Sequence, residues 1–440
     1  MLRQAPRQGA DGAVGPMNRI NGSPSAIARA IVLGIALIAL PAGALAADPA
    51  PVPLLAKEKP VDWWFVFKFN ASKFAGCGKD VPGDRDCRFG GAPRTRDNFG
   101  QQFAFASSAN GELVSGKDCV GTTTEDPVGA TFDQVYNGSF NYLLWNDQFY
   151  GDPKGVVCSS GQCAGRWGHS KGMLAWNDAG EGFVMQVSTP GWPRAGSNLF
   201  AKRSPNMGNT LGCSSSNNNL LASQHFFALR LDKNDLIAVL KALENASVVT
   251  DRKNLQIIKA GGPQEVKDQI ARLGEISDSV TATKVELSSK VILISKPSHL
   301  EVPPWQMVSA LLGNVGERAA TWWLKPWINS TARNTEIECW DKQQLGAKPG
   351  PVTIVGTGEW MKQEFSLTAT ANHAKIGVTT SGDKHYAIFG DLNQQGTIAP
   401  PGKCNASQNG RGGLFFVVEN KELFDSVSAL IGGKDAPPKK

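Results

Sequence analysis

The chain has 440 residues, a length that exceeds the usual single domain and predicts either two domains or one duplicated fold. Apolar residues make up 41% and charged residues 19%, with 48 Gly and 26 Pro, which fits a loop-rich globular protein and excludes a coiled coil, a collagen and a disordered acidic chain. The net charge is +6, and about half of it belongs to residues 1–46, so the remainder neither demands nor forbids a polyanionic partner.

Residues 1–46 have the features of a cleaved secretory signal. Arg19 and Arg29 precede the apolar run Ala30–Leu40, and Ala44–Ala46 supplies the small-x-small pattern that signal peptidase reads. The apolar run is too short for a helix to span a hydrocarbon core of about 30 Å. We therefore expect a secreted or periplasmic protein without a stable membrane anchor.

The cysteines fit export to an oxidising compartment, where an even set is expected to pair as disulfides. The eight are Cys77, Cys87, Cys119, Cys158, Cys163, Cys213, Cys339 and Cys404. They allow about 105 connectivities, so the sequence assigns none. The chain has no Cys-x-x-Cys and no His-x(3–5)-His spacing, which argues against a zinc site. We predict neither a metal nor a cofactor.

The remaining chain is predicted to be an α/β protein, because segments typical of strands and helices alternate in both halves. A Pro-rich spacer at 47–60 precedes an N-terminal lobe at 61–250. A C-terminal lobe follows at 251–433, and the chain is expected to end in a flexible tail at 434–440.

In the first half, aromatic and β-favouring residues predict strands at 61–69 and 142–145. Segments 167–175 and 182–188 predict a hairpin. Leucine and valine recur at helical spacing in 234–244 and predict a core helix.

The same kinds of pattern return in the second half. We predict strands at 255–259 and 290–294, helices at 264–273, 304–312 and 421–431, and a hairpin formed by 371–378 and 386–391.

Two segments, Gly168–Gly172 and Asn372–Lys375, share the form His-x-Lys, and each is expected in the first strand of a predicted hairpin. Alternate side chains of a strand point to the same face, so each imidazole is expected beside its own ammonium group. Sixteen residues after each Lys the chain reaches Val187–Ser188 and Asp391–Asn393. Small polar residues are therefore expected at matching depths on the second strands.

Paired His and Lys are the groups that phosphodiester cleavage without metal requires. One histidine attacks phosphorus, the other protonates the departing oxygen, and the lysines neutralise the phosphoryl oxygens. Weak acidity is the range in which one imidazole is neutral and the other charged. By contrast, His225, His299 and His385 lack this context and are expected to be structural.

These residues resemble the deoxyribonuclease II family, acid endonucleases with a duplicated phospholipase-D-like fold. The resemblance covers most of the chain after the signal. It is carried, in chain order, by Pro60–Val66, Leu143–Gln148, Gly168–Gly172, Gly182–Phe183, Ser188–Pro190, His373–Lys375, Gly390–Asn393 and Gly410–Gly413.

The resemblance implies two pseudo-symmetric lobes, each with a mixed β-sheet flanked by helices. It also implies a metal-independent endonuclease that cuts DNA through a phosphohistidine and leaves 3′-phosphate and 5′-hydroxyl ends. The catalytic residues implied are His169, Lys171, His373 and Lys375. The residues alone do not decide which histidine is the nucleophile, and analogy with related folds favours His169.

Four further residues are implied as substrate-binding or orienting groups. Ser188 and Asn393 are expected to orient the phosphate or the lysines. Asp391 is expected either to orient a histidine or to hold its hairpin. Arg411 is expected either to contact the nucleic-acid backbone or to lie solvated on the surface.

Some positions depart from the related patterns. Trp176 and Thr380 stand where the wider phospholipase D superfamily places an Asp, which favours the deoxyribonuclease branch over lipid hydrolases. Ala374 and Ile376 replace the Ser and Trp usual around the second Lys, and Val187 replaces a common His.

Two other functions remain open from the sequence. The chain could be a phospholipase-D-type enzyme acting on lipid head groups, or a DNA-binding module without catalysis, which would show salt-sensitive binding. A groove that reads only phosphates predicts weak sequence preference. Whether the protein is a monomer or a homodimer is undecided.

Overall fold

The computed structural model describes residues 49–70, 74, 102–117, 120–121, 124–136, 138–149, 157, 163–195, 211–212, 222–399 and 402–440. The predicted signal segment lies outside these residues. So do five cysteines: Cys77, Cys87, Cys119, Cys158 and Cys213. Every candidate site residue named above lies inside them.

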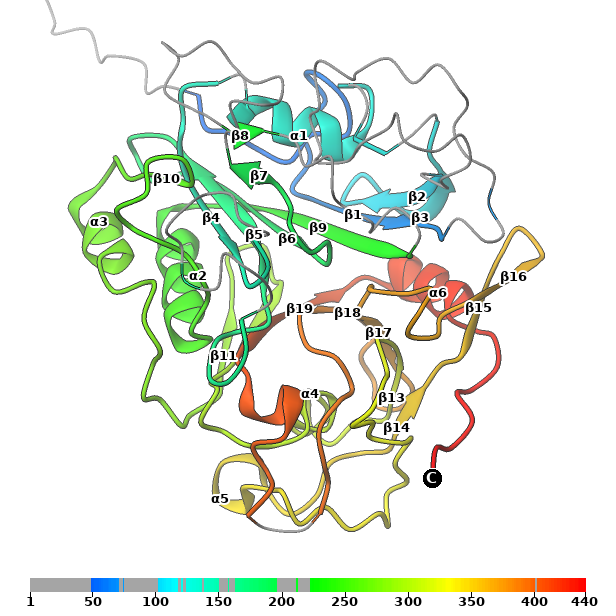
Figure 1. The fold of residues 1–440 in the computed structure, drawn as a ribbon. Helices are drawn as coiled ribbons and strands as arrows, with labels where there is room; N and C mark the ends of the chain where they lie inside the picture. Colours follow the sequence, from blue (N-terminus) through cyan, green and yellow to red (C-terminus); the bar gives the residue numbers. More distant parts are fainter. Residues whose placement is uncertain are drawn as a thin grey trace, which may run out of the picture. The chain divides into compact units, whose positions relative to one another are not determined.

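The hairpin that follows the first His-x-Lys motif belongs to a sheet of eight described strands (Figure 1). Its strand pairs are antiparallel. The spatial order is β10 (Ile258–Lys259), β4 (Asn141–Asn146), β5 (Lys171–Trp176), β6 (Gly182–Val187), β9 (Gln224–Leu231), β1 (Trp63–Lys68), β2 (Phe103–Ser107) and β3 (Asn110–Ser115).

The second motif leads into a sheet of seven described strands. This sheet is mixed, because β13 and β14 pair in parallel and the other pairs are antiparallel. The spatial order is β11 (Thr283–Glu286), β12 (Ile292–Lys296), β19 (Gly413–Glu419), β18 (Tyr386–Gly390), β17 (Ile376–Thr379), β13 (Glu317–Ala320) and β14 (Val352–Ile354).

The two sheets share an order of neighbouring strands. The run β4-β5-β6-β9-β1 in the first sheet corresponds to β13-β17-β18-β19-β12 in the second. The chain visits the corresponding strands in the same sequence, and each last strand leads into a helix, α2 (Lys233–Asn245) or α6 (Lys421–Leu430). The two His-x-Lys motifs therefore precede equivalent strands, β5 and β17.

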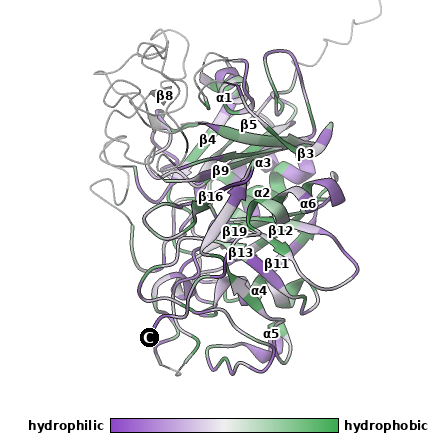
Figure 2. Ribbon diagram, turned by 90° about the vertical axis from the view of Figure 1, so that its right-hand side faces the viewer, coloured by the Kyte–Doolittle hydropathy of each residue, from purple (hydrophilic) through white to green (hydrophobic). Residues whose placement is uncertain are grey.

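Hydrophobic side chains form three layers around these sheets. One core lies between the sheets and contains the buried faces of α2 and α6. The other two cores cover the far faces, with α1 (Pro127–Tyr136) on the first sheet and α4 (Pro304–Leu311) on the second. In Figure 2, α6 carries both hydrophobic and hydrophilic residues, as expected of a helix with one face in the core. Residues Ala47–Lys440 form one compact unit, so both sheets share the central core.

Both central helices begin at a side chain that caps the exposed amide groups. Asp232 accepts a hydrogen bond from the amide of Asp235, and Asn420 accepts one from the amide of Leu423. The remaining elements are α3 (Gln264–Ile270), α5 (Lys342–Leu345), a 3₁₀ turn at Ser407–Gly410, and the small sheets β7 (Arg194–Ala195) with β8 (Leu211–Gly212) and β15 (Thr357–Trp360) with β16 (Gln363–Ser366).

The α/β class, both predicted hairpins and all predicted helices are present in the structure. The strand predicted at 255–259 is reduced to the two residues of β10. Because β10 pairs with β4, the first sheet extends past the boundary expected at residue 250. The sequence patterns missed α1, β9 and the hairpin of β2 and β3.

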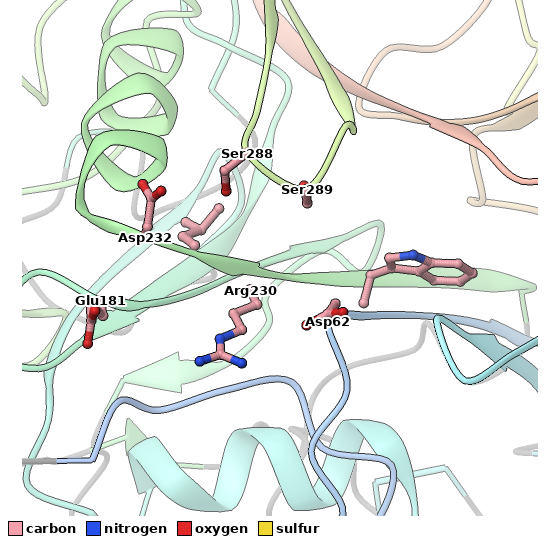
Figure 3. Close-up of a pocket in the computed structure, with 8 residues that line it drawn as sticks. Asp62, Glu181, Arg230, Asp232, Ser288 and Ser289 are labelled. Carbon is pink, nitrogen blue, oxygen red and sulfur yellow. The ribbon is translucent and has the colours of Figure 1, made fainter.

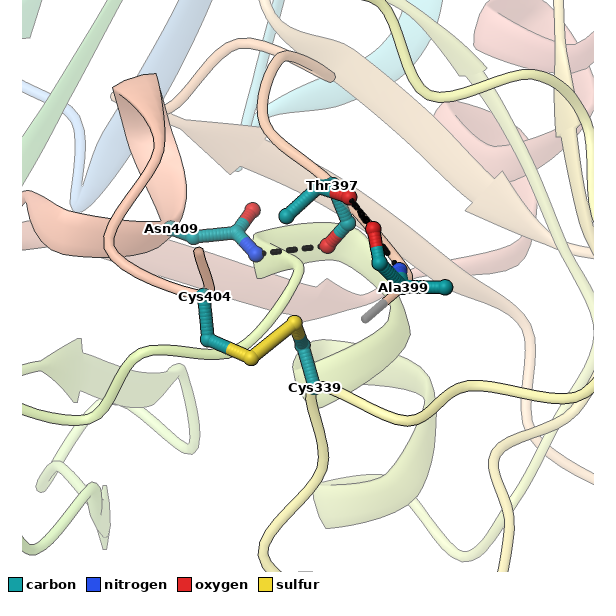
Figure 4. Close-up of a disulfide and its surroundings, with 5 residues drawn as sticks. All are labelled: Cys339, Thr397, Ala399, Cys404 and Asn409. Carbon is teal, nitrogen blue, oxygen red and sulfur yellow. Dashed lines mark hydrogen bonds between the residues drawn. A yellow bond between two sulfur atoms is a disulfide. The ribbon is translucent and has the colours of Figure 1, made fainter. Parts of the chain in front are cut away.

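One disulfide joins Cys339 to Cys404, with 5.3 Å between their Cα atoms (Figure 4). Cys163 is also disulfide-bonded, and no described cysteine is free. The terminal segment expected to be flexible is anchored by a hydrogen bond from the amide of Ala436 to the oxygen of Ile354. Within the described residues, we find no helix with the length and apolar character needed to cross a bilayer.

Candidate active site

The histidines of both His-x-Lys motifs lie before the first strands of their hairpins rather than within them, which corrects the sequence expectation. Lys171 is the first residue of β5, and Lys375 immediately precedes β17. The amide of His169 donates to the oxygen of Gly412 at 2.8 Å, and the amide of His373 donates to the oxygen of Ser223 at 2.8 Å. Each histidine is therefore held by main chain from the opposite half.

The two motifs meet in one buried cluster. The charges of Lys171 and Lys375 both act on each of the two motif histidines. Burial and the charge of Lys171 lower the pKa of His169 well below its usual value. Burial and neighbouring ammonium groups lower the pKa of His373 to about 3. The structure thus brings together all four residues that the resemblance implied as catalytic.

A buried carboxylate fixes the first lysine. Lys171 Nζ lies 2.5 Å from Oδ1 of Asp147, and the other oxygen of Asp147 accepts a hydrogen bond from Arg411 at 2.9 Å. Burial alone would raise the pKa of Asp147, but the charges of Lys171 and Arg411 hold it below its usual value. Asp147 therefore stays ionised and orients both cations.

Arg411 is consequently not a solvated surface residue, which corrects one of the two alternatives left open for it. Its side chain is only 6% exposed. It also donates to the main-chain oxygens of Trp167 and Gly168, directly before His169. Arg411 thus ties the second half to the first motif.

Asp391 contacts the first histidine through its main chain. Nδ1 of His169 lies 2.7 Å from the oxygen of Asp391. The Asp391 carboxylate accepts hydrogen bonds from Gln186 Nε2 and from the amide of Leu414. Burial raises the pKa of this carboxyl group to about 7. Both alternatives for Asp391 are thus represented: its oxygen contacts a histidine, and its side chain holds β18 against β19.

A chain of hydrogen bonds ends at the second histidine. The amide of His225 donates to Ser188 Oγ, and this hydroxyl donates to Gln224 Oε1 at 2.6 Å. The Gln224 amide nitrogen then faces Nδ1 of His373 at 3.3 Å. Ser188 therefore reaches His373 through Gln224.

The ring of His373 also stacks on an indole. The ring centroids of Trp322 and His373 are 5.0 Å apart, with 26° between the ring planes. An aromatic face attracts a cation placed over it. The stack can therefore favour the protonated form of His373, against the nearby lysines.

The second lysine has different partners from the first. Lys375 Nζ donates to the oxygen of His373 at 2.6 Å, and its amide donates to Nδ1 of His225 at 3.2 Å. Burial and the charge of Lys171 lower the pKa of Lys375 to about 7. Asn393 is also buried, and its side-chain amide nitrogen donates to Gln395 Oε1.

Sequence reasoning missed several residues of this cluster. Asp147 lies in the block Leu143–Gln148 that carries the resemblance, but nothing local marks it as the partner of Lys171. Gln224 and Trp322 carry no motif at all. His225, expected to be structural, supports the site through Lys375, whereas His299 and His385 contact Ser277 and Phe424 outside it.

A pocket of about 330 Å³ lies at the ends of β1 and β9 that are farther from the His-x-Lys cluster (Figure 3). It is lined by Asp62, Trp63, Glu181, Arg230, Leu231, Asp232, Ser288 and Ser289. These residues include the start of β1 and the end of β9, whereas the His-x-Lys cluster lies where β1 ends and β9 begins. In the described part of the chain, no group of three or more His, Cys, Asp or Glu side chains is arranged to hold a metal ion.

Comparison with known proteins identifies the family of the chain. The family model of deoxyribonuclease II matches residues 54–433. Plancitoxin-1 of Acanthaster planci is 23% identical over 400 residues, which cover 84% of this chain and 89% of that protein. Since the family match spans most of the chain and both His-x-Lys motifs, this protein belongs to the deoxyribonuclease II family.

Proposed function

We propose that this protein is a secreted endonuclease that hydrolyses DNA phosphodiesters without a metal ion, favoured at acidic pH. The observation that carries the proposal is one buried cluster formed by two His-x-Lys motifs from opposite halves. In this cluster the charge of each motif lysine acts on both motif histidines. This cluster supplies a nucleophile, a proton donor and two cations for one phosphate.

His169 is the nucleophile in this mechanism. A carbonyl oxygen only accepts hydrogen bonds, so the contact with Asp391 places the ring hydrogen on Nδ1 of His169. Nε2 then keeps its lone pair, and the lowered pKa keeps the ring neutral. Nε2 attacks phosphorus, and the bond from phosphorus to the 5′-oxygen breaks.

His373 is the proton donor. Gln224 contacts Nδ1 of His373, which leaves Nε2 as the ring nitrogen that can serve the substrate. As an imidazolium ion His373 carries a hydrogen on both ring nitrogens, and the proton of Nε2 passes to the departing 5′-oxygen. His373 then accepts a proton from the water that hydrolyses the phosphohistidine, which releases the 3′-phosphate and restores His169.

The lysines bind the charged oxygens of the phosphate. Lys171 is held by Asp147, and Lys375 by the oxygen of His373. A bound phosphodiester brings a negative charge next to His373, which raises its pKa from the low value of the empty site. Substrate therefore promotes protonation of its own acid catalyst. Ser188 and Asn393 are proposed to orient this set.

We also propose that the fold is a phospholipase-D-like duplication with lobes at 61–250 and 251–433. The matching order of five strands and the equivalent places of the two motifs support it. The Cys339–Cys404 disulfide is compatible with an oxidising compartment.

The test is nicking of a supercoiled plasmid in excess EDTA at about pH 5 and about pH 7, the range in which histidine titrates. Cleavage is expected, with 3′-phosphate ends that a polymerase cannot extend until they are dephosphorylated. His373→Ala should abolish cleavage, whereas His385→Ala, which changes a histidine outside the cluster, should not.

An intact plasmid at both pH values would overturn the proposal. Release of choline from phosphatidylcholine vesicles by the same preparation would then indicate the lipid phosphodiesterase. Mapped ends that cluster at one recognition sequence would contradict the weak sequence preference predicted from the sequence.

A further inference from the structure

Two buried lysines outside the His-x-Lys motifs occupy equivalent positions. Lys68 is the last residue of β1, and Lys296 is the last residue of β12, the corresponding strand of the second sheet. The two residues are 1% and 0% exposed. Burying an ammonium group is costly unless hydrogen bonds compensate for the lost water, so their partners are informative.

Lys68 leads to the second motif. Its ammonium group donates to the oxygen of the following residue, Phe69, at 3.1 Å and to the oxygen of Ala222 at 2.7 Å. The residue after Ala222 is Ser223, and its oxygen accepts the amide hydrogen of His373 at 2.8 Å. The first sheet thus reaches the histidine of the second half.

Lys296 repeats this pattern toward the first motif. Its ammonium group donates to the oxygen of the following residue, Pro297, at 3.2 Å and to the oxygen of Arg411 at 3.1 Å, and also binds the oxygen of Asn409. The residue after Arg411 is Gly412, and its oxygen accepts the amide hydrogen of His169 at 2.8 Å. The second sheet thus reaches the histidine of the first half.

We propose that Lys68 and Lys296 are positioning residues that each hold the main chain bearing the histidine acceptor of the opposite half, so that Lys68 positions His373 and Lys296 positions His169. The catalytic consequence rests on the function proposed above. An ammonium group suits this task because its three donors can bind several carbonyl oxygens at once. The crossed arrangement means that each histidine is placed only when both halves are docked.

The electrostatics of the two lysines agree with this role. Burial lowers the pKa of both ammonium groups to about 7, so all three donors are present in acid solution. Lys68 also lies close enough to His373 for its charge to lower the pKa of that ring. The charges that lower the pKa of His169 are instead those of Lys171, Lys375 and Arg411.

The test is amide hydrogen exchange in the full chain carrying Lys68→Met or Lys296→Met. Methionine has a similar length and cannot donate. With Lys68→Met, exchange at His373 should accelerate by about tenfold or more, as expected when a hydrogen bond from a charged donor is lost, while exchange at His169 changes little. Lys296→Met should give the converse.

Loosening of the histidine in the same half, or equal loosening of both histidines, would overturn the proposal. So would unchanged exchange at both. If a Met variant fails to fold, Gln replaces Met, and the same crossed pattern is required. Arg318→Met is the matched control, because Arg318 donates to the main-chain oxygens of Ile431 and Gly433 outside both paths. It should change exchange at neither histidine.

Plasmid cleavage supplies the second measurement. Both lysine variants should lower kcat by about tenfold or more with little change in KM, because a displaced catalytic group slows chemistry rather than binding. Cleavage by the wild-type chain without the crossed exchange pattern would overturn the positioning role alone. The crossed pattern in a chain that cuts no DNA would overturn the proposed function and leave the positioning role standing.

Discussion

Nδ1 of His169 lies 2.7 Å from the main-chain oxygen of Asp391, although 222 positions separate the two residues in the chain. Nδ1 of His373, in contrast, faces the amide nitrogen of Gln224. A carbonyl oxygen only accepts hydrogen bonds, so neutral His169 carries its hydrogen on Nδ1 and keeps the lone pair of Nε2, whereas the partner of His373 is a side-chain amide. The two rings of one duplicated motif therefore have different partners, which suits them to different steps.

This difference predicts opposite results for two variants with an activated substrate, thymidine 3′-(4-nitrophenyl phosphate). Nitrophenolate leaves without protonation, so His373→Ala should still form the phosphohistidine on His169 but hydrolyse it slowly. The expected result is a stoichiometric burst of nitrophenolate and a mass increase of one thymidine phosphoryl group. His169→Ala should show neither. A burst from His169→Ala would reverse the assignment of the two histidines.

Asp147 supports a second prediction, because its carboxylate binds both Lys171 and Arg411 in a buried place. Asp147→Asn leaves two buried cations poorly compensated, so the free energy of unfolding should fall by about 3 kcal/mol. Displacement of Lys171 should also lower kcat by about a hundredfold. Urea unfolding and plasmid cleavage measure the two effects.

The control for this variant is Glu286→Gln, which breaks the exposed pair between Glu286 and Lys290. It should cost at most about 0.5 kcal/mol and leave kcat unchanged. Similar losses in both variants would show that Asp147 has no special role in the cluster.

Trp322 supports a prediction about pH. If its indole face stabilises protonated His373, Trp322→Leu should move the basic limb of kcat to lower pH by about half a unit, the size of a cation–π contribution. Trp322→Phe keeps an aromatic face and should shift the limb less. Trp340→Leu changes an indole that binds Gly346 outside the site and should shift nothing. A profile that keeps its shape in Trp322→Leu would contradict this role.

The sequence predicted those parts of the fold that depend on local patterns. The hairpins at β5–β6 and β17–β18 carry runs of apolar β-favouring residues, and α2 and α6 carry helical periodicity with a capping residue. The motifs identified His169 and His373 because the chemistry requires these residue types at that spacing.

The rest depends on how the halves dock, which no local pattern reports. The first motif was expected within a strand, but the amide of His169 donates to the oxygen of Gly412, directly before β19 of the other sheet, and the hairpin begins at Lys171. The sequence could not decide whether Arg411 contacts nucleic acid or lies solvated on the surface, because its buried partner Asp147 is 264 residues away in the chain. Contacts over such separations arise only from tertiary packing.

Glu317 supports the last prediction, because it is a buried carboxyl group apart from the cluster. It is 1% exposed at the start of β13, and neither of its carboxyl oxygens has a hydrogen-bond partner among the described residues. Burial raises its pKa well above the usual value. Its contribution to stability is therefore fully present below about pH 4.3, the usual pKa of an unfolded Glu, and is lost as the pH rises through the raised folded pKa.

A glutamine side chain cannot ionise, so the Glu317→Gln variant should not lose this contribution to stability as the pH rises. Within the window between the two pKa values, the free energy of unfolding of the wild type should fall by up to about 1.4 kcal/mol per pH unit relative to the variant. Urea unfolding of both proteins at about pH 5 and about pH 7 measures the difference. The effects of the shifted pKa values of Asp391 and the buried lysines cancel in this comparison, because both proteins contain these residues. Glu359→Gln, at an exposed position, should track the wild type. Parallel pH dependences for the wild type and Glu317→Gln would mean that the buried carboxyl group does not ionise in this range.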